Sequence, residues 1–324
     1  MDNNTLIQPA SPESITRAAT LLRTGEPVAF PTETVYGLGA DGLNPTAIEK
    51  IFRAKGRPAD NPLILHVSSI ENAQRLVSEW PETAEKAARA FWPGPLTVIL
   101  PKSAIVPDIV TAGLPSVAIR MPAHPVAKAL IEQADMPIAA PSANRSGAPS
   151  PTTAQHVFDD LNGKIPLILD GGSCVHGLES TVLDLTGQTP TILRPGAATL
   201  EMLAEVLGEV ALSPAALAPL SENQPAPSPG LKHTHYSPRA CVILYAGPAA
   251  EQTAKQQSKI EKNSIYIEFS KDFTDLYEKL RHADDQNAER IYVVLPEGKG
   301  LALAAKNRLL RAAGFKVIHT EEKT

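Results

Sequence analysis

The sequence predicts an α/β protein whose twisted sheet mixes parallel and antiparallel strands, followed by a smaller, Rossmann-like α/β domain. The first domain is predicted because short apolar runs alternate with helical periodicity at first, and several apolar runs then follow one another with little helix between them. The second is predicted because strand–helix patterns return three times after a proline-rich stretch. We expect domains at 1–208 and 239–324, joined by a connector at 209–238.

Caps and periodicity predict the first elements. The Ser-Pro pair at 11–12 suits an N-cap and a first helical residue, apolar residues follow at helical spacing, and Gly25 suits the end of this helix. A short strand is expected at 28–30, followed by a turn rich in Thr and Gly. The Asn-Pro pair at 44–45 begins a second helix, and a buried strand is expected at 63–67.

The rest of the first domain is predicted from the same patterns. Further helices are expected near 70–79, 82–91, 125–134, 152–161 and 199–207. Further strands are expected near 96–100, 116–120, 137–140, 166–170, 180–185 and 191–194.

The connector and the second domain differ in composition. Residues 211–230 contain five prolines and few large apolar residues, which predicts an extended, semi-rigid segment. Behind it, apolar runs followed by helical stretches predict a small parallel sheet. Its strands are expected at 241–247, 264–270, 290–296 and 316–320.

Composition excludes several classes of protein. The chain has 324 residues, of which 43% are hydrophobic and 20% charged, so it can form a real core. Its net charge of −5 argues against a protein that coats nucleic acid by bulk electrostatics. The net charge does not exclude a local basic groove. Cys174 and Cys241 are far apart, as in a reduced, cytosolic protein. The polar N-terminus and the absence of an 18-residue apolar run predict a cytoplasmic protein without a signal peptide or membrane span.

The stretch 30–67 is the most informative part of the chain for function. Two apolar strands flank a Thr- and Gly-rich turn, a short helix and a Lys-Gly-Arg-Pro segment. Hydroxyls, backbone amides and two cations are therefore expected at the mouths of the strands, an arrangement that suits phosphate. Neither GxxxxGKS/T nor a GxGxxG after a strand is present. The pattern indicates a nucleotide binder that uses neither common phosphate loop.

Lys55 and Arg57 end the second predicted helix and are candidates for contacts with phosphate. Gly56 and Pro58 constrain the backbone, so that both side chains can project from one rigid turn. Two fixed cations would offset the charge of a triphosphate and stabilise charge that develops at phosphorus. On charge pattern alone, cations that simply suit a helix C-terminus remain the alternative.

Polar residues also follow other predicted strands. The Ser- and Asn-containing loop at 140–152 comes directly after a strand, where open α/β sheets place ligands, although an ordinary surface loop is the alternative. Arg120 and Arg194 end strands close to prolines, which favours bidentate contacts with carboxylate or phosphate over simple surface positions. Ser180 could supply a hydroxyl to the same region.

Nucleophilic and metal sites have little support. The chain lacks GxSxG and an evident nucleophile–base pair. His66, after an apolar strand, has the position of a structural histidine, and His233 with His235 lack a third close metal ligand. Cys174 lies near a histidine, so a thiol nucleophile at this position is an alternative that the sequence does not exclude.

Eight segments in series carry a family resemblance. They occur in this order over about the first 200 residues: FPTETVYGLG, KGRP, NPLILHV, WPGPLTVIL, SVAIRMP, APSANRSG, GLESTV and LRPG. Together they closely resemble the YrdC-like threonylcarbamoyl-AMP synthase family. The connector with its HYSP segment and the domain behind it resemble the family's longer, two-domain form.

The resemblance implies a nucleotidyltransferase that makes L-threonylcarbamoyladenylate and pyrophosphate from L-threonine, bicarbonate or carbon dioxide, and ATP. It implies that the product passes to a tRNA threonylcarbamoyl transferase complex, which modifies tRNA to N6-threonylcarbamoyladenosine, and that direct contact with tRNA could occur. Mg²⁺ is expected to bind mainly through the ATP phosphates, without a metal site of the protein itself. The connector is expected to close over the site as a lid that excludes water from a labile anhydride.

The resemblance also implies the site residues. Lys55 and Arg57 match the catalytic Lys-x-Arg pair. The ATP-binding group comprises Lys55, Arg57, Asn61, Ser116, Ser142, Asn144, Ser150, Arg194 and Tyr236, the last folding back over the nucleotide. The threonine-binding group comprises Thr32, Thr34, His66, Arg120, the backbone at Ala140, and Ser180.

Three alternatives remain open on the sequence. The first is an RNA-binding module that acts in tRNA or ribosome maturation without adenylate synthesis. The second is a carbamoyltransferase for metalloenzyme maturation, although such chains carry acylphosphatase and zinc-finger segments, and the cysteine pattern for these is missing here. The third is a structural α/β protein, which would leave the clustered Arg, Lys and Ser residues at strand ends unexplained.

Overall fold

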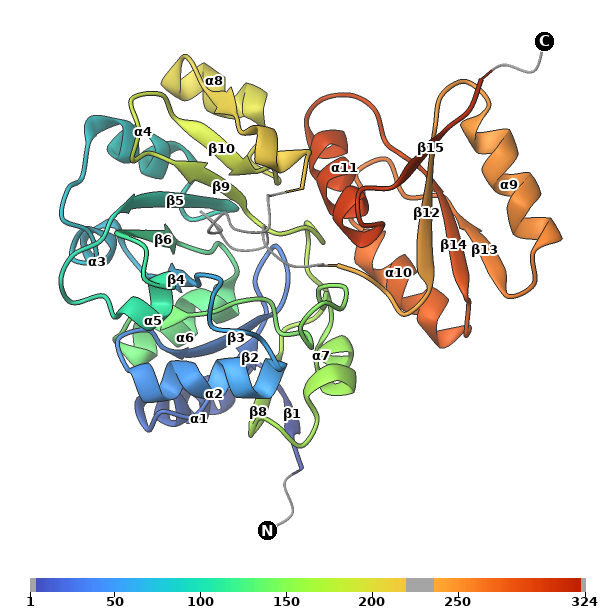
Figure 1. Ribbon diagram of the computed structural model, residues 1–324. Helices are drawn as coiled ribbons and strands as arrows, with labels where there is room; N and C mark the ends of the chain where they lie inside the picture. Colours follow the sequence, from blue (N-terminus) through green and yellow to red (C-terminus); the bar gives the residue numbers. More distant parts are fainter. Residues whose placement is uncertain (1–3, 220–235, 322–324) are drawn as a thin grey trace.

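The computed structural model describes residues 4–219 and 236–321, and these form two sheets of eleven and four strands (Figure 1). In spatial order, the large sheet contains β1 (Leu6–Pro9), β8 (Leu167–Asp170), β2 (Val28–Phe30), β3 (Gly37–Asp41), β7 (Ile138–Ala139), β4 (Ile64–His66), β6 (Ser116–Arg120), β5 (Leu96–Pro101), β9 (Thr181–Asp184), β10 (Thr191–Arg194) and β11 (Ala211–Leu212).

Pairing in the large sheet is mixed, as predicted. Strand β8 runs parallel to both β1 and β2, and β4 runs parallel to β6. Strand β3 runs antiparallel to β2 and β7, and β5 runs antiparallel to β6. In the parallel pair β4–β6, His66 lies opposite Arg120, which brings two predicted site residues to the same sheet edge.

Helices cover both faces of the large sheet. Helices α1 and α6 pack against one face, and α2, α4, α7 and α8 contribute to the larger core on the other. The helices of this domain are α1 (Pro12–Arg23), α2 (Pro45–Lys55), α3 (Ile70–Gln74), α4 (Glu82–Phe91), α5 (Asp108–Thr111), α6 (Pro125–Ala134), α7 (Ala154–Leu161) and α8 (Leu200–Leu207).

The predicted caps of α1 and α2 are present. The side chain of Ser11 accepts a hydrogen bond from the backbone of Ser14 in a capping box, and Asn44 accepts from the first turn of α2. Helix α2 ends at Gly56, whose φ of 60° lies in the left-handed region that glycine adopts readily. The chain therefore turns sharply before Arg57.

Strand β3 was not predicted, because its sequence GLGAD carries glycines that are rare in strands. Tertiary packing explains these residues. A Cβ atom on Gly39 would lie 2.7 Å from side-chain atoms of both Phe30 and Ile138. Strand β1 and helix α5 were also missed, and α3 ends at Gln74 rather than near residue 79.

The smaller sheet is parallel throughout, as predicted for the C-terminal domain. Helix α9 covers one face, whereas α10 and α11 lie on the other face, toward the large domain (Figure 1). In spatial order the strands are β13 (Ser264–Ile267), β14 (Arg290–Val294), β12 (Cys241–Ala246) and β15 (Val317–His319), and the helices are α9 (Ala250–Ile260), α10 (Leu276–Asp285) and α11 (Leu301–Ala312).

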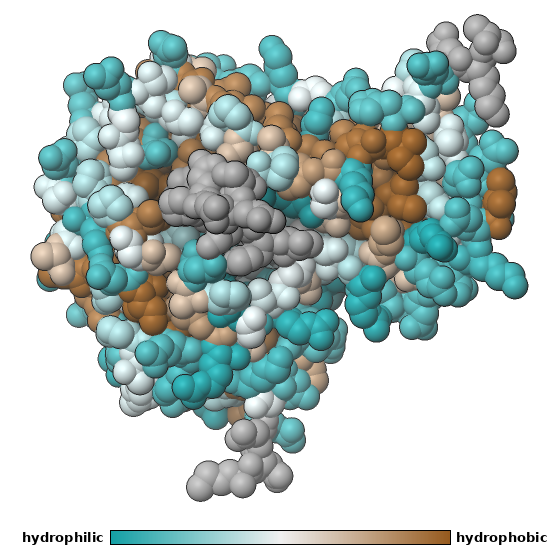
Figure 2. Space-filling view, in the orientation of Figure 1, coloured by the Kyte–Doolittle hydropathy of each residue, from teal (hydrophilic) through white to brown (hydrophobic). Residues whose placement is uncertain are grey.

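The two domains meet closely. A Cβ atom on Gly177 would lie 2.1 Å from the backbone oxygen of Thr274 in the C-terminal domain, so only glycine allows this approach. Figure 2 shows apolar residues gathered over α11, whereas most of the rest of the C-terminal domain is hydrophilic in this view. Among the helices within 4–219 and 236–321, none combines the length and apolar character needed to cross a membrane.

The first part of the predicted connector is structured. Strand β11 pairs with β10, and a 3₁₀ turn, η1 (Pro214–Ala216), follows it. Residues 220–235, which hold most of the predicted lid, lie outside the described residues. We keep the division at 1–208, 209–238 and 239–324 as a proposal.

Candidate active site

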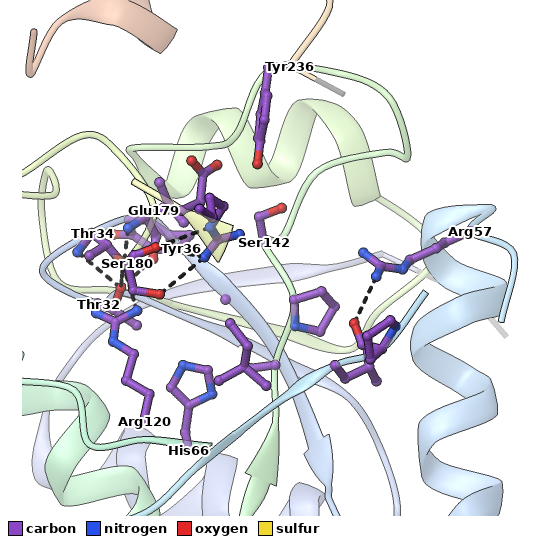
Figure 3. Close-up of a pocket in the computed structure, with 18 residues that line it drawn as sticks. Thr32, Thr34, Tyr36, Arg57, His66, Arg120, Ser142, Glu179, Ser180 and Tyr236 are labelled. Atoms are coloured by element: carbon purple, nitrogen blue, oxygen red, sulfur yellow. Dashed lines mark hydrogen bonds between the residues drawn. The ribbon is translucent and has the colours of Figure 1, made fainter. Parts of the chain in front are cut away.

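A pocket opens where β4, β6 and β10 end and β9 begins, beside the loop after β7 (Figure 3). Ten predicted site residues line it: Thr32, Thr34, Arg57, His66, Arg120, Ala140, Ser142, Ser180, Arg194 and Tyr236. Figure 3 shows Thr32, Thr34, His66, Arg120 and Ser180 gathered at one end, Arg57 at another side, and the hydroxyl of Tyr236 pointing into the pocket.

Arg120 is held from several sides at the first end. Its Nη2 donates to Oε1 of Glu33 at 2.6 Å, and its Nη1 donates to the hydroxyl of Thr34 at 2.9 Å. Its Nε donates to the backbone oxygen of Gly94 at 3.2 Å. These contacts use three of the five N–H groups of an arginine. The guanidinium is therefore fixed in place, yet keeps donors that a carboxylate could accept.

Glu33 was missed by sequence reasoning, although it lies inside the FPTETV segment. Burial raises the pKa of its carboxyl, but the charge and hydrogen bond of Arg120 outweigh this and leave the pKa lowered. Its Oε2 also accepts from the backbone of Ala123 at 3.0 Å. The signal that could have found it is a carboxylate in a segment flanked by buried strands, which requires a partner.

His66 lies beside Arg120 and is buried. Burial, and then the charge of Arg120, lowers the pKa of His66 to about 3, so its imidazole is neutral at physiological pH. Among the described residues, its Nδ1 is buried without a hydrogen-bond partner. The ring of Phe30 packs edge-on against it, with ring centroids 6.4 Å apart. A neutral ring with an unpartnered nitrogen can bind a ligand but is a poor base.

Arg194 and Ser180 hold each other at the ends of β9 and β10. The Nε and Nη2 atoms of Arg194 donate to the backbone oxygen of Ser180 at 3.1 and 3.0 Å. The hydroxyl of Ser180 lies 3.2 Å from Nη2 of Arg194 and 2.8 Å from the hydroxyl of Thr97. Gly196 allows this arrangement, because a Cβ atom there would lie 2.4 Å from the backbone nitrogen of Thr181.

Arg57 reaches the pocket from the turn after α2. Its Nη2 donates to the backbone oxygens of Asn61 and Pro62 at 3.0 and 3.1 Å. Its Nε is buried and has no hydrogen-bond partner among the described residues. Burial lowers the pKa of Arg57 to about 10, so the guanidinium still carries its charge at neutral pH. A fixed cation with an unpartnered donor is suited to an anionic ligand.

Lys55 lies behind the pocket wall rather than in its lining. Its Nζ donates to the backbone oxygens of Ser142 and Asn144 at 2.5 and 2.6 Å, and lies 3.5 Å from Oδ1 of Asn144. Burial, followed by the charge of Arg57, lowers the pKa of Lys55 well below its usual value, and the opposing charge of Asp160 offsets only part of this. In this structure Lys55 holds the loop after β7 in place.

Four other predicted residues also lie outside the lining. Asn144 folds back on its own loop, donating to the backbone of Arg145 and Ala148. Ser150 is fully buried and donates to Oε1 of Glu179 at 2.5 Å. Asn61 is buried beside Arg57 and contributes its backbone oxygen, and Ser116 begins β6 away from the pocket.

Glu179 is the second residue that sequence reasoning missed, and it lines the pocket directly before Ser180. Burial raises the pKa of its carboxyl, but the charges of Arg308 and Arg194 outweigh this and leave the pKa lowered. Sequence signals could not have found its partner Arg308, which lies 129 residues away in another domain.

Among the described residues, the geometry supports neither a cysteine nucleophile nor a metal site. Burial raises the pKa of the Cys174 thiol to about 12, so it is protonated at neutral pH. Within residues 4–219 and 236–321, no group of three or more His, Cys, Asp or Glu side chains could hold a metal ion. His233 and His235 lie outside the described residues.

Both domains of the chain are similar to known protein families. Residues 20–196 match the Sua5/YciO/YrdC family model, described as "Telomere recombination", and residues 198–314 match "Threonylcarbamoyl-AMP synthase, C-terminal domain". The threonylcarbamoyl-AMP synthase of Pyrococcus abyssi is 47% identical over 322 residues, covering 93% of this chain and 94% of the relative.

The chain belongs to the threonylcarbamoyl-AMP synthase family. The family's enzyme from Bacillus subtilis is 44% identical over 332 residues, covering 94% of both chains. A crystal structure of Pyrococcus abyssi Sua5 complexed with L-threonine superposes with a TM-score of 0.90 at 44% identity, covering 98% of this chain and 99% of that one. The predicted family and its two-domain architecture are thereby confirmed.

Proposed function

We propose that this family member is an L-threonylcarbamoyladenylate synthase, which converts L-threonine, bicarbonate or carbon dioxide, and ATP into threonylcarbamoyl-AMP and pyrophosphate. The observation that carries the proposal is one pocket whose two sides suit different substrates, in a chain that matches threonylcarbamoyl-AMP synthases over nearly its full length. The relative solved with L-threonine supports threonine as one of these substrates.

The reaction requires no nucleophile from the protein. The threonine amine and bicarbonate combine to a carbamate, releasing water. A carbamate oxygen then attacks the α-phosphorus of ATP, and the bond to pyrophosphate breaks. The protein's task is to position the two reactants and stabilise charge, as in other phosphoryl-type transfers. The high pKa of the Cys174 thiol agrees with a mechanism that uses no thiolate.

The end around Arg120 suits threonine. The remaining N–H donors of Arg120 can grip the threonine carboxylate, while Glu33 and Thr34 hold the guanidinium in orientation. Neutral His66 and the hydroxyl of Ser180 can bind the amine or hydroxyl of the substrate. With Thr32 and the backbone of Ala140, these residues make up the proposed threonine-binding group.

The side around Arg57 suits the nucleotide. Arg57 and Arg194 are fixed cations, and Ser142 and Tyr236 lie in the same lining. We propose that Arg57 offsets charge on the phosphates and that Lys55 acts with it by holding the 142–146 loop. In this scheme Asn61, Asn144 and Ser150 support that lining from behind, and Ser116 stays a predicted ATP residue. Mg²⁺ enters as part of the MgATP substrate, because this ion needs few protein ligands.

The product's fate also belongs to the proposal. The adenylate would pass to a tRNA threonylcarbamoyl transferase complex in the cytoplasm, with direct tRNA contact as an optional feature. Cys174 and Cys241 are free thiols, which agrees with a reducing compartment.

The test is pyrophosphate release from MgATP, measured with threonine and bicarbonate each left out in turn. We expect release only when both are present, and a product that contains threonine, carbonate-derived carbon and AMP by mass spectrometry. Hydrolysis of ATP regardless of threonine would contradict the proposal. Salt-dependent tRNA binding without any threonine-dependent release would instead favour the RNA-binding alternative.

A further inference from the structure

A residue of the C-terminal domain reaches the wall of the pocket. Arg308, on α11, is fully buried, and its Nε donates to Oε2 of Glu179 at 2.7 Å. Its Nη1 donates to the backbone oxygen of Pro195 at 3.0 Å, directly after Arg194. Its guanidinium also lies 5.4 Å from the ring centroid of Tyr236. One side chain of the second domain thus contacts three pocket-forming segments of the chain.

Tyr277, on α10, completes this cluster. Its hydroxyl donates to the carboxylate of Glu179 at 2.7 Å, and its ring lies 5.6 Å from that of Tyr236, centroid to centroid. Glu179 in turn accepts from the hydroxyl of Ser150. Tyr236 adopts a φ of 65°, which is rare for a residue with a side chain and therefore needs support from its surroundings.

We propose that Arg308 and Tyr277 are positioning residues for the nucleotide side of the pocket, and that the C-terminal domain completes the active site through them. The inference rests on the proposed function, since Ser150, Arg194 and Tyr236 all belong to the proposed ATP group. Arg308 and Tyr277 touch none of the pocket's open volume; they act by fixing Glu179, the backbone beside Arg194 and the ring of Tyr236.

The structure offers a matched control, an arginine that joins the domains through partners that do not line the pocket. Arg281, also on α10, forms an ion pair with Asp160 of the large domain at 2.7 Å and donates to the backbone oxygen of Pro149. Neither Asp160 nor Pro149 lines the pocket, whereas Glu179, the partner of Arg308, does. For Tyr277, the control is Tyr245, which stacks on Tyr292 at the opposite face of the small sheet.

The experiment compares R308M with R281M, and Y277F with Y245F, in the full-length protein. We expect R308M to lower kcat/KM for ATP by about 100-fold, as displaced binding groups can, and Y277F by about tenfold, the value of one hydrogen bond to a charged group. The KM for threonine should change far less, and R308K should recover part of the loss. The affinity of R308M and Y277F for a non-hydrolysable ATP analogue, measured by calorimetry, should fall in parallel with their kcat/KM. R281M and Y245F should keep kinetic constants and analogue affinity near the wild-type values.

Two results would overturn the inference. One is that R281M impairs ATP use as strongly as R308M, which would reduce Arg308 to a general domain contact. The other is that threonine and ATP kinetics change equally in both R308M and Y277F. If R308M does not fold, Y277F decides the question, since it removes only a hydroxyl. If the wild-type protein shows no threonine-dependent release of pyrophosphate, the proposed function is contradicted instead. The calorimetric comparison of ATP-analogue affinity would then still test the positioning role.

Discussion

The pocket end around Arg120 is formed by strand ends and a turn of one domain, whereas the side around Arg57 and Tyr236 is formed by loops that both domains support. At the first end, Glu33, Thr34 and Gly94 fix Arg120 within a single buried network. At the second, the supporting residues Lys55 and Arg308 come from distant parts of the chain. The difference suggests that the small substrate meets a preformed site, while the nucleotide side depends on how the domains come together.

Removing Arg120 tests whether the first end is preformed by its ion pair. We expect R120M to abolish threonine binding and to destabilise the protein by about 3–5 kcal/mol, because Glu33 is left buried without its partner. Thermal unfolding and threonine calorimetry measure the two effects. Adding E33Q should restore much of the stability but none of the threonine affinity; recovery of both would show that Arg120 has no role in binding.

Removing Arg57 tests the charge at the nucleotide side. We expect R57M to lower kcat/KM by roughly 100- to 1,000-fold, the usual effect of deleting one preorganised donor to developing charge. R57K should recover little, since lysine lacks the planar fork. The control is R53M, at an exposed position on the preceding helix, α2. Equal rates for R57M and R53M in the pyrophosphate assay would exclude the catalytic role.

The buried histidine makes a pH prediction for the first end. His66 has a pKa of about 3 in the folded protein, against 6.5 for an unperturbed histidine. The unfolded chain therefore binds more protons below pH 6.5, and stability that is present above this pH is lost as the pH falls. Between pH 7.5 and pH 5 the loss should be about 2 kcal/mol.

Denaturant titrations of the wild type and H66Q at both pH values measure this difference. H66Q should show a smaller drop in unfolding free energy between pH 7.5 and pH 5. An identical drop in the two proteins would mean that His66 does not titrate as expected.

Lys55 separates direct phosphate contact from loop support. Its contacts to the backbone of Ser142 and Asn144 predict that K55M loosens the 142–146 loop and weakens ATP-analogue affinity about tenfold, a typical value for hydrogen bonds to a charged group. K50M, which removes a partly exposed ion pair from the same helix, is the control. A loss in kcat with unchanged affinity would instead place Lys55 at the reacting phosphate.

The smallest expected effect belongs to Cys174. Its pKa of about 12 predicts that C174S keeps full activity at pH 7, as should C241S at the exposed cysteine. Pyrophosphate release with both variants provides the measurement. A selective loss of activity in C174S would revive the thiol nucleophile and undermine the comparison between the two pocket sides.

Local patterns were sufficient for much of this protein. The Ser-Pro and Asn-Pro caps, the helical spacing of apolar residues and the proline-rich stretch predicted α1, α2 and the two-part fold, because each depends on residues close together in sequence. Arg120 and Ser180 were also predicted, because each lies at the end of an apolar strand, at the sheet edge where ligands bind. Arg57 was predicted because it follows the end of a helix in a turn that Gly56 and Pro58 constrain.

Tertiary structure alone decided the rest, because the deciding contacts join residues that no local pattern connects. Strand β3 contains glycine at position 39 because the side chains of Phe30 and Ile138 leave no room for a larger residue there. Glu33 and Glu179 became site residues only when burial required partners for their charges, Arg120 from 87 residues away and Arg308 from 129. Lys55, read from sequence as a phosphate ligand, lies behind the wall because the loop after β7 supplies its acceptors.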